Sequence, residues 1–101
     1  GAFYKDAEVA VVGGGDVADP QAFVLALGAI IADHDILRIK GFASASGKQA
    51  RLVNQAVGPR IQHFFDRPWS ADELRQTSLV VIGEKGLNEA AITAAIQAEL
   101  R

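Results

Sequence analysis

Three adjacent residues, Asp33, His34 and Asp35, place a histidine between two carboxylates. Carboxylate oxygens and an imidazole nitrogen can bind hard or borderline divalent ions. Three consecutive residues at a helix end rarely point at one centre, however, and a histidine there also suits the helix dipole. The triplet is therefore interpreted mainly as a structural cap, and direct metal binding at Asp33, His34 and Asp35 is the alternative.

The second histidine, His63, precedes two phenylalanines in a predicted strand. A histidine in this setting is more often a packed or surface residue than a metal ligand. The sequence has two histidines and no cysteine, so a tetrahedral zinc site would have to use carboxylates. The lack of cysteine also excludes a disulfide framework and a cysteine nucleophile, and it is compatible with the cytoplasm, where we expect the protein to be.

A glycine-rich segment, Gly13-Gly14-Gly15-Asp16, invites comparison with phosphate-binding loops. It matches neither G-x-x-x-x-G-K-[ST] nor G-x-G-x-x-G, because Ala18 stands where the second pattern needs its last glycine. A flexible strand-to-helix connection is the better interpretation. The serines do not form a G-x-S-x-G element either, so we expect no enzyme activity within these residues.

Basic side chains recur along the predicted strands and could form an interaction face. They are Arg38, Lys40, Arg51, Arg60 and Arg67. Such a face could contact another protein or domain, bind an anion or a nucleic acid, or simply be solvated. The formal net charge of −2 provides no overall field that would attract nucleic acid or an anionic membrane. A protein or domain contact is favoured, and nucleic acid is not expected.

The first half of the chain alternates strand and helix signals. Residues 7–12 favour a strand. Asp19 is a good N-cap for a helix that starts at Pro20 and ends near residues 33–35. Residues 36–45 and 51–57 then predict a hairpin, in which Leu37 and Ile39 face the helices while Arg38 and Lys40 face the other way.

The second half continues the sheet and ends in a helix. Gly58-Pro59 predicts a bend or bulge before a strand over residues 61–65. Ser70 and Glu73 match a capping box, which predicts a helix of one or two turns. Residues 79–82 are continuously apolar and predict a central buried strand. Asn88 then caps the final helix.

Together these elements predict one α+β domain over residues 1–101, in two layers. We expect one mixed or antiparallel sheet of about four or five strands, with two main helices on one face, in the order β-α-β-β-β-β-α. The longest apolar run is shorter than the ~20 residues of a membrane span, and no signal sequence is visible, so no membrane partner is expected.

Four blocks in fixed order resemble the C-terminal domain of the CobW family. The first two are residues 36–42 and 51–60. The last two, residues 65–69 and 79–83, lie within or beside the stretch R-P-W-x-x-x-E-x-R-x-T-x-L-V-x-I-G. With the element L-R-x-K-G-x in the first block, this stretch makes the resemblance specific, and the similarity extends from about residue 7 to residue 100.

The resemblance implies an accessory domain excised from a longer P-loop GTPase of metal metabolism. That longer chain would use GTP with magnesium and handle cobalt or zinc, with cobalt delivery for cobalamin biosynthesis as the branch it most resembles. Its partners would be the N-terminal GTPase domain, a metal target such as a cobalt chelatase, or a second copy. The family motifs P-loop, C-x-C-C and N-K-x-D do not occur in these residues, so the segment itself is expected to bind no cofactor. A stand-alone anion- or nucleic-acid-binding module is the alternative.

Overall fold

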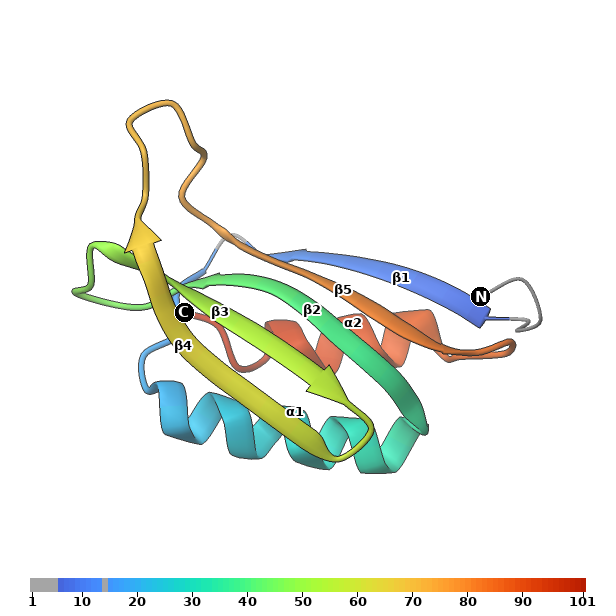
Figure 1. Cartoon of the computed structure of the whole chain (residues 1–101). Helices are drawn as coiled ribbons and strands as arrows, with labels where there is room; N and C mark the ends of the chain where they lie inside the picture. The colour runs from blue at the N-terminus through green and yellow to red at the C-terminus, as the bar shows by residue number, and fades with distance from the viewer. Residues whose placement is uncertain (1–5, 14) are drawn as a thin grey trace.

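The computed structural model describes residues 6–13 and 15–101. The described elements are β1 (Asp6–Gly13), α1 (Pro20–His34), β2 (Ile36–Ser44), β3 (Ala50–Val57), β4 (Arg60–Pro68), β5 (Thr77–Glu84) and α2 (Glu89–Gln97). The strands form one sheet in the order β1-β5-β2-β3-β4, and all neighbouring strands are antiparallel. Figure 1 shows both helices on the same side of this sheet. The predicted α+β class and element order are confirmed.

One hydrophobic core fills the space between the helices and the sheet. α1 contributes Phe23, Leu27, Ile30 and Ile31, α2 contributes Ile92 and Ile96, and the sheet contributes chiefly Ile36, Ile39, Leu52, Leu79 and Val81. Complete burial of an aliphatic side chain of this size stabilises the fold by roughly 1.5–3 kcal/mol before entropy losses. The helix-covered side of the sheet is therefore where the fold is stabilised.

The boundaries of α1 follow from local chemistry. The Asp19 carboxylate accepts hydrogen bonds from the backbone N–H groups of Gln21 at 3.0 Å and Ala22 at 3.3 Å. The helix ends because Asp35 adopts a left-handed conformation with φ 51° while its N–H still reaches the carbonyl of Ile31. The predicted start and end of this helix are confirmed.

β2 departs from simple alternation at its first residues. Ile36 and Ile39 are both buried, whereas Leu37 is 39% exposed. The pairing of β2 with β5 shifts register between Ile36 and Arg38, as a bulge does. Leu37 borders a hollow together with Gly28, Ile31 and Ala32 of α1, so it keeps the predicted position on the helix side but lies at an exposed margin of it.

Gly58 and Pro59 form the turn of a hairpin between β3 and β4. Val57 pairs with Arg60 across this two-residue turn, and Gly58 has a positive φ of 56°, the conformation that glycine adopts at the first position of a type II′ turn. β4 runs to Pro68, beyond the predicted limit, because its pairing with β3 continues to Ala50.

The short helix predicted at residues 70–73 is not formed, and the prediction was wrong. One of the two capping-box bonds is present, in which the Ser70 N–H donates to the Glu73 carboxylate at 2.8 Å. The Glu73 N–H donates to the Ser70 backbone carbonyl at 3.1 Å instead of the Ser70 hydroxyl, which closes a turn. The same carboxylate also accepts from Arg67, which holds it back toward β4. Figure 1 shows this segment projecting beyond the end of the sheet.

β5 is an interior strand with β1 on one side and β2 on the other. Leu79 and Val81 are fully buried under the helices, but Val80 and Ile82 are partly exposed on the opposite face. The burial predicted for residues 79–82 therefore applies only to the face of β5 that the helices cover. Among the described residues no helix has the length and apolar character needed to cross a membrane.

Candidate interaction face

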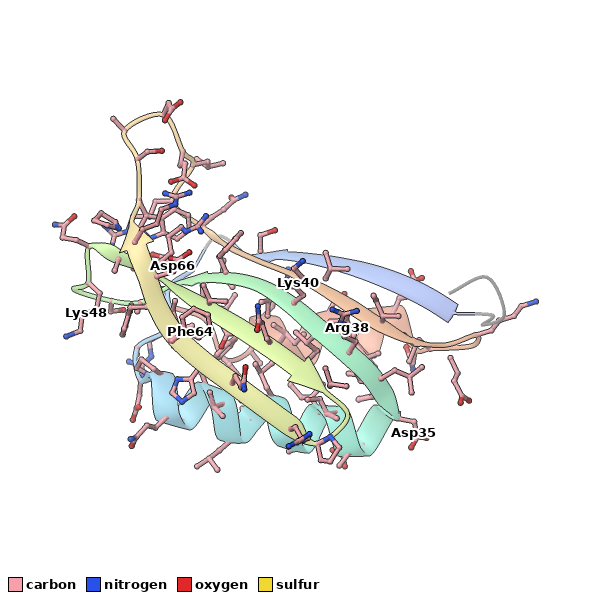
Figure 2. All side chains as sticks on the ribbon, in the orientation of Figure 1. Asp35, Arg38, Lys40, Lys48, Phe64 and Asp66 are labelled. Atoms are coloured by element: carbon pink, nitrogen blue, oxygen red, sulfur yellow. The ribbon has the colours of Figure 1, made fainter. Side chains whose placement is uncertain are left out.

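The face of the sheet opposite the helices is hollowed and largely apolar. The hollow has a volume of about 720 Å³. Its lining comes from β2, β3, β4 and β5: Arg38, Lys40, Gly41, Phe42, Val53, Gln55, Phe64, Asp66, Ser78, Val80 and Ile82. We call this surface the open face. In Figure 2 the labelled Arg38, Lys40, Phe64 and Asp66 lie over it, on the side of the sheet away from the helices.

Two cations lie in the middle of the open face. Arg38 and Lys40 are exposed residues of β2. The residues opposite Lys40 on its two neighbouring strands are Val80 and Gln55, which are uncharged. Within the described part of the chain neither cation forms an ion pair. Both charges are thus free to meet a carboxylate or phosphate of another molecule.

Arg51 has a different environment, although it also comes from the predicted basic set. It is 9% exposed, and its guanidinium lies 3.7 Å from the centre of the Phe42 ring. Its Nε donates to Asp66 Oδ1 at 3.2 Å, Nη2 pairs with Oδ2, and Nη1 donates to Glu73 Oε2 at 3.4 Å. Arg51 therefore joins β3 to β4 and the projecting segment, and it contacts two residues that line the hollow, Phe42 and Asp66.

Arg67 completes this network from β4. Its guanidinium donates to the two oxygens of Glu73 at 2.6 and 2.9 Å. These bonds and those from Ser70 hold the pKa of Glu73 well below its ordinary value. The bond from Arg51 lowers the pKa of Asp66 in the same way, so both carboxylates neutralise arginines.

The five predicted basic residues do not gather on one surface. Arg38 and Lys40 lie on the open face, Arg51 and Arg67 are paired with carboxylates, and the exposed Arg60 follows the β3–β4 turn. Sequence reasoning could not see this division, because Asp66 and Glu73 come close to Arg51 only after the strands pair. Phe42 and Phe64 also line the hollow.

The metal candidates lie at the opposite end of the molecule from the projecting segment. Asp33, His34 and Asp35 border a smaller hollow of about 310 Å³ together with Glu84 of β5. Among the side chains that the structure describes, no three of His, Cys, Asp or Glu come close enough to hold a metal ion. The described residues therefore do not fit a metal site. Asp35 has the structural role of ending α1.

His63 is an exposed residue of the edge strand β4, where it lies opposite Asn54 of β3. Among the described side chains it belongs to no group of three or more His, Cys, Asp or Glu that could hold a metal ion. The predicted surface position of this histidine agrees with the fold.

The glycine-rich connection is explained by packing against the C-terminus. Asp16 and Arg101 exchange two backbone hydrogen bonds, of 2.6 and 2.9 Å. A Cβ atom on Gly15 would lie 2.5 Å from the Arg101 carbonyl oxygen, so a larger residue would disturb this contact. Gly14 lies outside the described residues.

Comparison with known protein families decides the relationship. Residues 10–100 match the family described as the cobalamin synthesis protein cobW C-terminal domain. The chain belongs to this family. The resemblance recognised in the sequence blocks is confirmed, and the matched region holds no P-loop pattern.

Two curated relatives are named zinc chaperone CobW. The one from a Sinorhizobium species is 55% identical over 84 residues, which are 83% of this chain and 24% of the relative. The one from Pseudomonas aeruginosa is 54% identical over 74 residues, which are 73% of this chain and 20% of the relative. This chain thus spans a quarter or less of either relative.

Two solved structures share the fold. The Zn(II)-bound YjiA GTPase from E. coli has a TM-score of 0.75 and 31% identity, and the match covers 96% of this chain and 30% of that one. A Zn(II)-bound triple mutant of the YjiA GTPase has a TM-score of 0.76 and 28% identity, with the same coverage. The two-layer domain therefore occurs as one part of a larger GTPase.

Proposed function

We propose that this chain is the non-catalytic interaction domain of a GTP-dependent metal chaperone and that its open face binds the GTPase domain of the longer protein. The observation that supports this is the hollow, where apolar side chains surround Arg38 and Lys40. A solvated face of an antiparallel sheet is usually polar, whereas an exposed apolar patch is typical of a contact surface. The bound surface would carry carboxylates opposite the two cations.

The longer protein would bind GTP with magnesium and carry a divalent metal ion as its cargo. The names of the two relatives favour zinc, while the family description points to cobalamin synthesis and so to cobalt delivery to a chelatase. Competition between zinc and cobalt for the full-length protein, followed by transfer to an apo-target, separates these two proposals.

The proposal is tested with the double substitution Arg38→Glu and Lys40→Glu in the full-length protein. We expect the isolated domain to remain folded by circular dichroism, because both side chains are exposed. In the full-length protein, we expect the contact with the GTPase domain to weaken by at least about tenfold, which corresponds to ~1.4 kcal/mol. Arg60→Glu is the matched control, since Arg60 is a cation outside the hollow.

Full domain contact and full nucleotide-coupled activity in the folded double variant would remove the open face from the mechanism. The non-catalytic part of the proposal has its own test: calorimetric titration of this chain with GTP and magnesium should show no saturable heat. Salt-sensitive binding of this chain to oligonucleotides would instead favour a nucleic-acid-binding role.

A further inference from the structure

β4 is an edge strand whose centre has no protection against pairing. Among the described strands it pairs with β3 alone. An exposed edge presents unpaired backbone groups to other strands, and proteins usually protect such edges with charges, prolines or bulges. In β4 these features lie at the two ends, at Arg60 and at residues 66–68, while the centre reads Ile-Gln-His-Phe-Phe.

The hairpin turn determines which backbone groups of β4 face outward. In a two-residue turn the residues that flank it, here Val57 and Arg60, form a hydrogen-bonded pair. Hydrogen-bonding direction alternates along a strand, so Gln62 and Phe64 also turn their N–H and C=O groups toward β3. Those of Ile61, His63 and Phe65 point to the open edge.

Two adjacent phenylalanines of β4 are exposed on opposite faces of the sheet. Phe64 is 47% exposed and lines the open face, and Phe65 is 43% exposed on the helix-covered face. A helix or domain laid on one face would cover one of them. A strand added beside β4 would cover the flanks of both and would also satisfy the outward backbone groups.

We infer that β4 pairs antiparallel with β4 of a second copy, about a two-fold axis at His63. Identical antiparallel strands must pair symmetrically. With the axis at His63, Ile61 lies opposite the partner's Phe65 and Arg60 lies opposite the partner's Asp66. The register places an apolar pair on one face, and on the other it brings Arg60 beside an Asp66 that also accepts from Arg51 of its own copy. Each pair occurs twice, and the apolar pair carries most of the complementarity.

A shift of the axis to Phe64 would lose both complementary pairs. Ile61 would then lie opposite the partner's Arg67, and Arg60 opposite the partner's Pro68. The side-chain pattern of β4 therefore favours the axis at His63. The inference uses the edge of the sheet and does not depend on the proposed role of the open face.

The paired segment is short, so association is weak and depends on concentration. Sedimentation equilibrium of this chain should show a shift from the 10.7 kDa monomer to a dimer between about 10 µM and about 1 mM. Hydrogen exchange provides residue-level detail: the amides of Ile61, His63 and Phe65 should become protected as the concentration rises, because they donate across the new interface.

His63→Pro removes one outward N–H and leaves the β3–β4 ladder intact, since proline is tolerated at an edge. It should weaken dimerisation by at least about tenfold. Phe65→Lys, which places a cation opposite the partner's Ile61, should do the same and serves as a second variant if the proline variant does not fold. Leu25→Lys alters an exposed leucine of α1 and should leave dimerisation unchanged.

A chain that stays monomeric up to about 1 mM would overturn the inference, given the concentration range expected for so short an interface. Equal dimerisation of the wild type and of folded His63→Pro and Phe65→Lys variants would do so as well. Dimerisation abolished by Arg38→Glu with Lys40→Glu, but unchanged in the β4 variants, would assign self-association to the open face instead.

Discussion

The guanidinium of Arg51 is bound on three sides: it lies over the Phe42 ring at 3.7 Å and donates to both Asp66 and Glu73. Phe42 belongs to β2, Asp66 to β4 and Glu73 to the projecting segment. One side chain of β3 therefore connects three parts of the chain and holds two residues of the open-face hollow, Phe42 and Asp66.

Arg51→Met should lower the melting temperature, because it keeps much of the side-chain volume but leaves Asp66 and Glu73 without one of their cations. Thermal unfolding measured by circular dichroism checks this. The fluorescence of Trp69, the single tryptophan, should change too, since it lies where the projecting segment begins. Arg60→Met is the matched control. Equal melting temperatures for the two variants would contradict the structural role of Arg51.

The network should make stability depend on acid pH. The pKa values of Asp66 and Glu73 are lower in the folded chain than their ordinary values. Their contribution is therefore complete above the ordinary carboxyl pKa of about 4 and is lost as the pH falls through the lower folded values.

Glu73→Gln tests this linkage by removing one titrating group. We expect this variant to melt below the wild type at about pH 7, and the difference to shrink as the pH falls below about 4, where the unfolded wild-type chain takes up a proton at this carboxylate. A difference in melting temperature that stays constant over this range would show that Glu73 does not act through its charge.

Val81→Asp should unfold the domain. Val81 is fully buried under the helices, and an unpaired charge there should cost more than about 4 kcal/mol. Val80→Asp is the matched control on the adjacent, partly exposed position of the same strand, and should cost about 1 kcal/mol or less. Urea unfolding curves compare the two. Similar midpoints would show that the assignment of faces on β5 is incorrect.

Asp19→Ala should reduce stability by about 1 kcal/mol, the usual effect of losing an N-cap. Its carboxylate accepts from two backbone N–H groups at the start of α1. Asp33→Ala in the last turn should have no such effect, because a negative charge there opposes the helix dipole. Chemical denaturation with a common slope provides the comparison, and equal losses in both variants would rule out the capping role.

How far the sequence predicts this fold depends on how local each feature is. Asp19 and Asn88 bond to N–H groups two or three residues away, so the starts of both helices can be predicted from neighbouring residues. The apolar stripes of the helices and the alternation in β5 are likewise short-range patterns, and they determine the two layers. The family resemblance could be recognised for the same reason, since it rests on contiguous blocks.

What only the tertiary structure decided is the fate of the charged residues and the shape of the open face. Arg51 donates to Glu73, which lies 22 residues away in sequence. This contact separates Arg51 from the exposed cations Arg38 and Lys40, and it involves the carboxylate of a segment that forms a turn where a helix was predicted. The bulge at Leu37 and the hollow likewise arise from strand registers that no local pattern specifies. Pairing between strands far apart in the chain determines which cations are neutralised and leaves Arg38 and Lys40 without an ion-pair partner in the described part of the chain.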